Sequence, residues 1–128
     1  MIARMCDLLR AKPGPDSGAY YENKARRYLA RRGVKTLACN YHCRFGEIDL
    51  IAMDKQTLLF VEVRYRTAAL YGCAVASVTA KKQEKIRLTA KHYLQKHRHG
   101  NRMPCRFDVV GIEINDRKLN YRWIKNAF

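Results

Sequence analysis

Two adjacent apolar runs that carry acidic residues constrain the fold of this chain more than any other feature. They lie within residues 41–66, which read YHCRFGEIDLIAMDKQTLLFVEVRYR. Runs rich in Ile, Leu, Phe and Val are typical of strands, and the short polar break at residues 54–56 predicts a hairpin. Because an isolated carboxylate is costly to bury, Asp49 and Glu62 require a positive partner.

The predicted hairpin places these two acids on neighbouring strands. Strand side chains alternate between faces, so Glu62 and Arg64 share one face of the second strand. If Asp49 lies on the same face of the first strand, the two carboxylates form one acidic pocket. Oxygen ligands without thiols are typical of a site for Mg²⁺. An acid paired with a nearby arginine explains the same spacing, and spacing alone does not separate the two interpretations.

The balance of charge predicts the kind of partner. The chain has 128 residues, with 26 Lys and Arg against 11 Asp and Glu, and a formal net charge of +15 at pH 7. Hydrophobic residues make up 48% of the sequence, so we expect one folded domain and not a basic disordered tail. Such a positive excess attracts polyanions, and we expect nucleic acid before an anionic membrane surface. A role in solubility alone is the alternative.

Cysteine spacing and the lack of long apolar runs indicate a cytoplasmic protein. The five cysteines form no paired C-x-x-C framework, and Cys39-x-x-x-Cys43 lacks the second ligand pair of a zinc site. The N-terminal segment lacks the apolar core of a secretion signal, and no run reaches the about 18 apolar residues of a membrane span. We therefore expect reduced cysteines, a cytoplasmic location and no membrane partner.

Periodicity and turn residues predict the remaining elements. Residues 1–16 contain Pro13-Gly14-Pro15 and predict a flexible arm before a single domain at 17–128. Apolar spacing predicts a helix from residue 17 to about residue 32, and a second helix that Ser77 or Thr79 caps and that ends near residue 97. A mobile loop is expected at 67–77 beside the site. We expect strands over residues 34–41, 47–53, 57–65, 105–114 and 119–124. The order α-β-β-β-α-β-β is a mixed α/β fold, in which the second helix joins two parallel strands.

Two polar residues lie at the edges of the buried stripes on these basic helices. Glu22 precedes the apolar Ala25 by three residues, and Gln83 precedes Ile86 by three, so both face inward. A first-turn Glu favoured by the helix dipole is the simpler explanation for Glu22. Basic residues cover the other helix surfaces, and we expect phosphate contacts from Arg26, Arg27, Lys81, Lys82 and Lys85.

Several motifs along the chain resemble one known family. They are G-x-x-x-E at residues 18–22, GEIDLIA at 46–52, FVEVR at 60–64, TAKKQ at 79–83, RFDVV at 106–110 and the final NAF. Together they resemble the YraN-like family of uncharacterised bacterial proteins, which are similar to archaeal Holliday-junction resolvases. The resemblance implies a restriction-endonuclease-like fold and a nuclease dependent on Mg²⁺ or Mn²⁺ that acts on branched or structured DNA. It also suggests a homodimer, because junction-cleaving relatives work as dimers.

The resemblance also implies roles for individual residues. Asp49 matches the strand acid and Glu62 the first residue of an E-x-K pair, and both would hold the metal with the backbone carbonyl of Val63. Glu22 matches an additional helical acid. Gln83 matches the polar residue on the second helix that positions water.

Arg64 departs from the family pattern because it stands at the lysine position of E-x-K. A desolvated lysine can lose its proton, whereas arginine stays protonated in proteins. Arg64 could still stabilise negative charge on a phosphate, with the base supplied by a metal-bound water. The alternative is a non-catalytic nucleic-acid-binding module within a DNA repair or recombination assembly.

Overall fold

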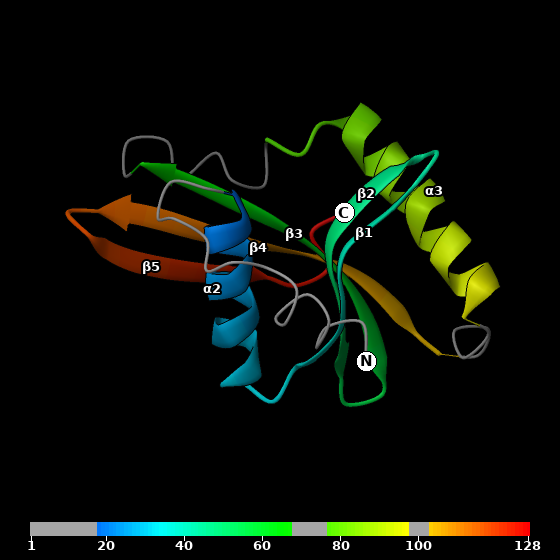
Figure 1. Ribbon diagram of the computed structural model, residues 1–128, viewed down its shortest axis with the longest axis horizontal. Coiled ribbons are helices and arrows are strands. Elements are labelled where there is room, and N and C mark those ends of the chain that lie inside the picture. The colour runs from blue at the N-terminus through cyan, green and yellow to red at the C-terminus, as the bar shows by residue number, and fades with distance from the viewer. Residues whose placement is uncertain (1–17, 68–76, 98–102) are drawn as a thin grey trace.

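The computed structural model describes residues 18–67, 77–97 and 103–128. Its elements are α2 Gly18–Ala30, β1 Lys35–Cys43, β2 Gly46–Asp54, β3 Thr57–Thr67, α3 Ala80–Lys96, β4 Cys105–Asn115 and β5 Lys118–Ile124 (Figure 1). This order confirms the predicted mixed α/β fold. The expected arm at residues 1–16 and most of the expected loop at 67–77 lie outside the described residues.

The strands form one five-stranded sheet in the order β1-β2-β3-β4-β5. Strands β3 and β4 are parallel, with a ladder from Leu58↔Cys105 to Thr67↔Ile114, and the other neighbouring pairs are antiparallel. A parallel pair needs a long connection, which α3 supplies. The structure therefore confirms both the predicted hairpin of β2 and β3 and the predicted parallel pair.

Local sequence sets the ends of both helices. After α2, residues 31–33 form a turn in which Gly33 has a φ of +84°, a left-handed conformation that glycine adopts without strain. At the start of α3, the hydroxyl of Thr79 accepts a hydrogen bond from the amide of Lys82 at 3.2 Å. Neither of these two described helices is long and apolar enough to span a membrane.

The two helices cover opposite faces of the sheet. Phe60 of β3 packs in the core beneath α3, and the next residue, Val61, packs in the core beneath α2. Side chains alternate along a strand, so Glu62 and Arg64 lie on the same face as Phe60, beside α3. The acid and arginine of the FVEVR motif therefore face the start of the second helix.

A buried ionic cluster fixes the C-terminal residues to the sheet. The side chain of Asp108 on β4 is 0% exposed. Its carboxylate accepts hydrogen bonds from Arg106 Nε at 2.9 Å, from the indole Nε1 of Trp123 at 2.8 Å and from the amide of Asn126 at 2.9 Å. The RFDVV and NAF motifs therefore meet at one carboxylate, so both motifs have a structural role in this cluster.

Candidate functional site

Strands β2 and β3 separate at the point where the two predicted acids lie. Their ladder runs from the hairpin turn to Leu50↔Val61 and ends there, one residue before Asp49 and Glu62. Beyond this point the β1–β2 hairpin turns toward α3 while β3 continues in another direction (Figure 1). The Oδ2 atom of Asp49 accepts a hydrogen bond from the amide of Val63 at 2.8 Å. The carboxylate therefore satisfies a β3 amide where the strand ladder has ended.

Two carboxylates lie side by side in this gap. Asp49 is 9% exposed and Glu62 is 4% exposed, and a side-chain hydrogen bond joins them. Burial and then the negative charge of Glu62 raise the pKa of Asp49 to about 9, although the hydrogen bond from Val63 acts to lower it. Asp49 is therefore protonated at neutral pH in the absence of a metal ion, and its proton serves the bond to Glu62.

Two cations contact Glu62 from different elements. Its Oε2 atom lies 3.0 Å from Arg64 Nη2 and 2.8 Å from Lys82 Nζ. Arg64 comes from the next same-face position of β3, and Lys82 comes from the first turn of α3. The buried Nε of Arg64 has no hydrogen-bond partner within the described parts of the chain. Since buried N–H groups are nearly always paired, this donor suits an oxygen of a ligand or a water molecule.

Sequence reasoning misses the ion pair of Lys82, because the sequence predicts for this residue only a contact to phosphate. A signal for it was present in the helix periodicity. Lys82 precedes the buried Ile86 by four residues, so both lie on the face of α3 that packs on the sheet. The sequence could not show which strand residue this face would meet.

The two predicted polar residues from the helices, Glu22 and Gln83, have different relations to the acid pair. The negative charge of Glu22 on α2 contributes to the raised pKa of Asp49, which places this third acid within electrostatic range of the pair. The side-chain amide of Gln83 donates to the carbonyl of Val78 at 3.0 Å, so it stabilises the start of α3. The expected role of Gln83 in positioning water stays a prediction.

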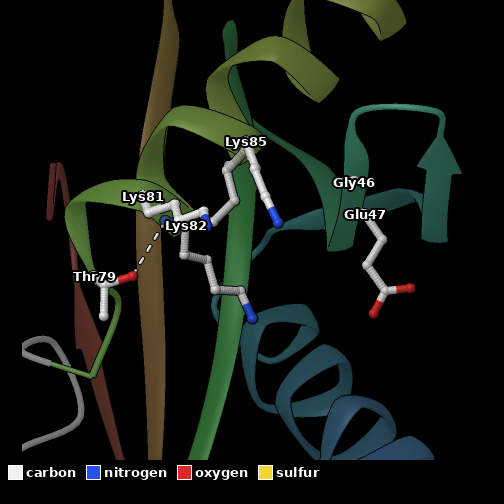
Figure 2. A pocket seen from close by; sticks show the side chains of 7 residues that line it. Gly46, Glu47, Thr79, Lys81, Lys82 and Lys85 are labelled. Carbon is white, nitrogen blue, oxygen red and sulfur yellow. Dashed lines mark hydrogen bonds between the residues drawn. The ribbon is translucent and has the colours of Figure 1, made fainter.

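The predicted phosphate-binding residues fall on opposite faces of the sheet. The α3 group lines a cavity of about 400 Å³ that opens between α3 and the Gly46 end of β2 (Figure 2), and it consists of Lys81, Lys82 and Lys85. On α2, the guanidinium of Arg26 donates to the side-chain oxygen of Asn23 at 2.8 Å. The charge of Arg27 acts on Tyr121 of β5, where it opposes the burial that raises the pKa of that tyrosine.

The donor set of the acid pair fits a hard divalent cation. Within residues 18–67, 77–97 and 103–128, no group of three or more His, Cys, Asp and Glu side chains is placed to hold a metal ion. Mg²⁺, however, is commonly held by one or two carboxylates, with water and phosphate oxygens completing its coordination. Such an ion would offset the repulsion between the two crowded carboxylates and would favour the deprotonated form of Asp49. The carbonyl of Val63 stays a predicted third ligand.

Replacing Asp49 by Asn is expected to raise the melting temperature of the metal-free protein, and to raise it more at higher pH. The folded state binds the Asp49 proton more tightly than the unfolded chain does, because burial raises the pKa from an ordinary value of 3.8 to about 9. The stability of the wild type therefore falls as pH rises through this interval. Asn has the shape of protonated Asp and does not titrate, so thermal melts with chelator at pH 5 and pH 8.5 measure the difference.

The same variant tests where a metal ion binds. Mg²⁺ or Mn²⁺ should raise the melting temperature of the wild type, because a ligand of the native state stabilises it. Asp49→Asn should lose this response, whereas Glu84→Gln, which removes a carboxylate from an exposed position on α3, should keep it. An undiminished response to the metal in Asp49→Asn would place the ion elsewhere.

Comparison with known proteins identifies the family of this chain. A sequence profile of the uncharacterised protein family UPF0102 matches residues 21–112. A UPF0102 protein of Nitrosococcus oceani is 45% identical over 113 residues, which cover 88% of this chain and 91% of that protein. Another, of Alcanivorax borkumensis, is 43% identical over 122 residues, covering 94% and 96% of the two chains. A third, of Aeromonas hydrophila, is 46% identical over 115 residues, covering 89% and 85%. This chain therefore belongs to the UPF0102 family, the YraN-like family that its motifs resemble.

Proposed function

We propose that this protein is a nuclease dependent on Mg²⁺ or Mn²⁺ that cleaves branched or structured DNA in the cytoplasm. The observation that carries the proposal is the pair of buried carboxylates, Asp49 and Glu62, in the gap between β2 and β3. Simple binding of nucleic acid does not need buried acids, since they repel phosphate unless a metal neutralises them. A nuclease that depends on Mg²⁺ or Mn²⁺ uses such acids to hold the metal.

Each residue of the site has a distinct part in this proposal. The metal, when bound, would supply a water of lowered pKa and neutralise charge on the phosphate. Asp49 and Glu62 would hold it, and Asp49 would give up its proton on binding. Arg64 would direct its unpaired Nε–H to a phosphate oxygen. Glu22 would orient water or a second ion, and Gln83 would position water.

The arginine at the lysine position does not remove lysine from the site. Lys82 brings an ammonium group within 2.8 Å of Glu62 from α3, while Arg64 occupies the strand position. Both kinds of cation are therefore present around the same carboxylate. This arrangement supports a site that can bind the reacting phosphate as well as the metal.

A panel of DNA substrates tests the proposal. Four-way junction, flap, single-stranded and duplex DNA should be incubated with Mg²⁺ or Mn²⁺ and, as the control, with chelator. We expect cleavage of branched substrates that depends on the metal. Resolution of a four-way junction requires symmetrical cuts in two of its four strands, so we also propose a homodimer, which sedimentation of the protein in solution would detect.

A non-catalytic module that binds nucleic acid within a repair or recombination assembly is the second candidate. Arg64 at the position of the expected lysine favours it, because arginine does not act as a base. Tight binding without any metal-dependent product, in the wild type and in Arg64→Lys, would decide for this second candidate.

Replacing Arg64 by Lys is expected to retain or increase cleavage. Arg64 and Glu62 share a strand face, so an ammonium at position 64 would stay beside the acid pair. Arg64→Ala should instead lower the cleavage rate by about 100-fold or more, the typical loss when one preorganised donor to a developing charge is removed. Single-turnover rates on the preferred branched substrate measure both variants. A rate for Arg64→Ala equal to that of the wild type would exclude Arg64 from phosphate binding.

A further inference from the structure

The cavity beside α3 has one basic wall and one fixed wall. Lys81, Lys82 and Lys85 come from the first turns of α3, and Figure 2 shows the side chains of Lys82 and Lys85 directed toward the space before β2. The opposite wall begins at Gly46, where an added Cβ would lie 3.3 Å from the hydroxyl of Thr89 and 3.5 Å from Lys85 Cβ. The start of β2 is thus packed closely on α3 at the edge of the cavity.

We propose that this cavity is a subsite for one phosphate of a nucleic acid strand, next to the phosphate that binds at Asp49 and Glu62. The inference rests on the proposed function and adds a second, separate phosphate position to it. The cavity, with a volume of about 400 Å³, has ample room for a phosphate with its sugar. Among the described lining residues, three ammonium groups face the carboxylate of Glu47, and the lining stays positive in balance even though Lys82 also pairs with Glu62.

The lining also indicates which part of the nucleic acid enters. None of the described residues that line it is aromatic, so this part of the lining offers no ring on which a base could stack. Lys81 and Lys85 form no ion pair within the described parts of the chain, so their charges are available to a phosphate. The subsite therefore recognises the backbone and is indifferent to base sequence.

Lys82 connects this subsite to the acid pair. Its Nζ lies 2.8 Å from Glu62 Oε2, and the same side chain lines the cavity. The two positions are therefore neighbours that share one lysine between them. A strand that places one phosphate at the acids would run directly past Lys82 into the cavity, and this would fix the register of the strand at the site.

The test compares two double variants of the same helix. Lys81→Gln/Lys85→Gln changes the cavity, and Lys91→Gln/Lys96→Gln removes the same charge from exposed positions farther along α3. With chelator present, so that no cleavage occurs, we expect about a tenfold loss of affinity for single-stranded and branched DNA in the cavity variant. The slope of log affinity against log salt concentration should become shallower by about one in this variant, the value for one lost phosphate contact. Equal losses in the two double variants would overturn the proposal.

Chemical replacement of single phosphates locates the contact. A neutral methylphosphonate is placed at each linkage of an oligonucleotide in turn, and oligonucleotides with and without a 5′-phosphate are compared. At one position the replacement should weaken binding to the wild type but not to the cavity variant. This coupling between the phosphate and the two lysines defines a direct contact. Coupling at an internal linkage identifies a phosphodiester, and coupling to the 5′-phosphate identifies a strand end. Coupling at neither overturns the proposal, whereas failure of the nuclease proposal would show only as lack of cleavage.

Discussion

Replacing Glu62 by Gln is expected to abolish metal-dependent cleavage while DNA binding is kept or strengthened. Gln preserves the size of the side chain but removes the negative charge that would hold the metal. Even residues that only orient a metal ligand typically contribute 10- to 100-fold to activity, so we expect a loss of more than about 100-fold. Arg64 and Lys82 both contact this carboxylate, and its neutralisation frees two cations for phosphate.

The opposite directions of these two effects make Glu62→Gln informative. A variant that merely unfolds would lose binding together with cleavage, and a variant that lost only surface charge would keep cleavage. Glu84→Gln provides the matched control, because it removes one carboxylate from an exposed position of α3. Cleavage and anisotropy should be measured on the same junction substrate. Glu62→Gln with the cleavage rate of the wild type would show that this carboxylate does not hold the metal.

The sequence predicted the central hairpin and its acids because both depend on short-range rules. Strand periodicity placed Glu62 and Arg64 on one face, and the polar break fixed the turn. The sequence did not predict that β2 and β3 separate after the pair of Leu50 and Val61. Beyond that pair the Val63 amide donates to the side chain of Asp49 and not to a backbone carbonyl of β2. Local patterns do not report where a ladder ends.

Contacts between distant elements escaped sequence reasoning for a different reason. The pair of Lys82 with Glu62 depends on how the α3 crossover packs on the sheet, which the helix period alone leaves open. The contacts of Asp108 depend on the register of β4 and β5, since Trp123 and Asn126 lie 15 and 18 residues farther along the chain. The RFDVV motif carries a family resemblance, but an acid among buried apolar residues also requires partners, which the sequence does not name.

Replacing Asp108 by Ala is expected to destabilise the protein by about 3 to 5 kcal/mol, the range for removing one partner of a buried ion pair. The carboxylate is fully buried and accepts hydrogen bonds from the Arg106 guanidinium, the Trp123 indole and the Asn126 amide. Its loss leaves these donors unsatisfied and a cavity behind. For a domain of this size we expect the melting temperature to fall by about 10 to 25 °C.

Two further variants give this prediction a scale. Trp123→Phe removes a single donor and should cost about 1 to 2 kcal/mol, so it remains measurable if Asp108→Ala does not fold. Asp116→Asn removes a carboxylate from an exposed turn, where a positive φ suits Asn, and should change stability by less than about 0.5 kcal/mol. Denaturant unfolding of all three variants gives the order. If Asp108→Ala lowered the free energy of unfolding no more than Asp116→Asn does, the contacts between the RFDVV and NAF motifs would not stabilise the sheet.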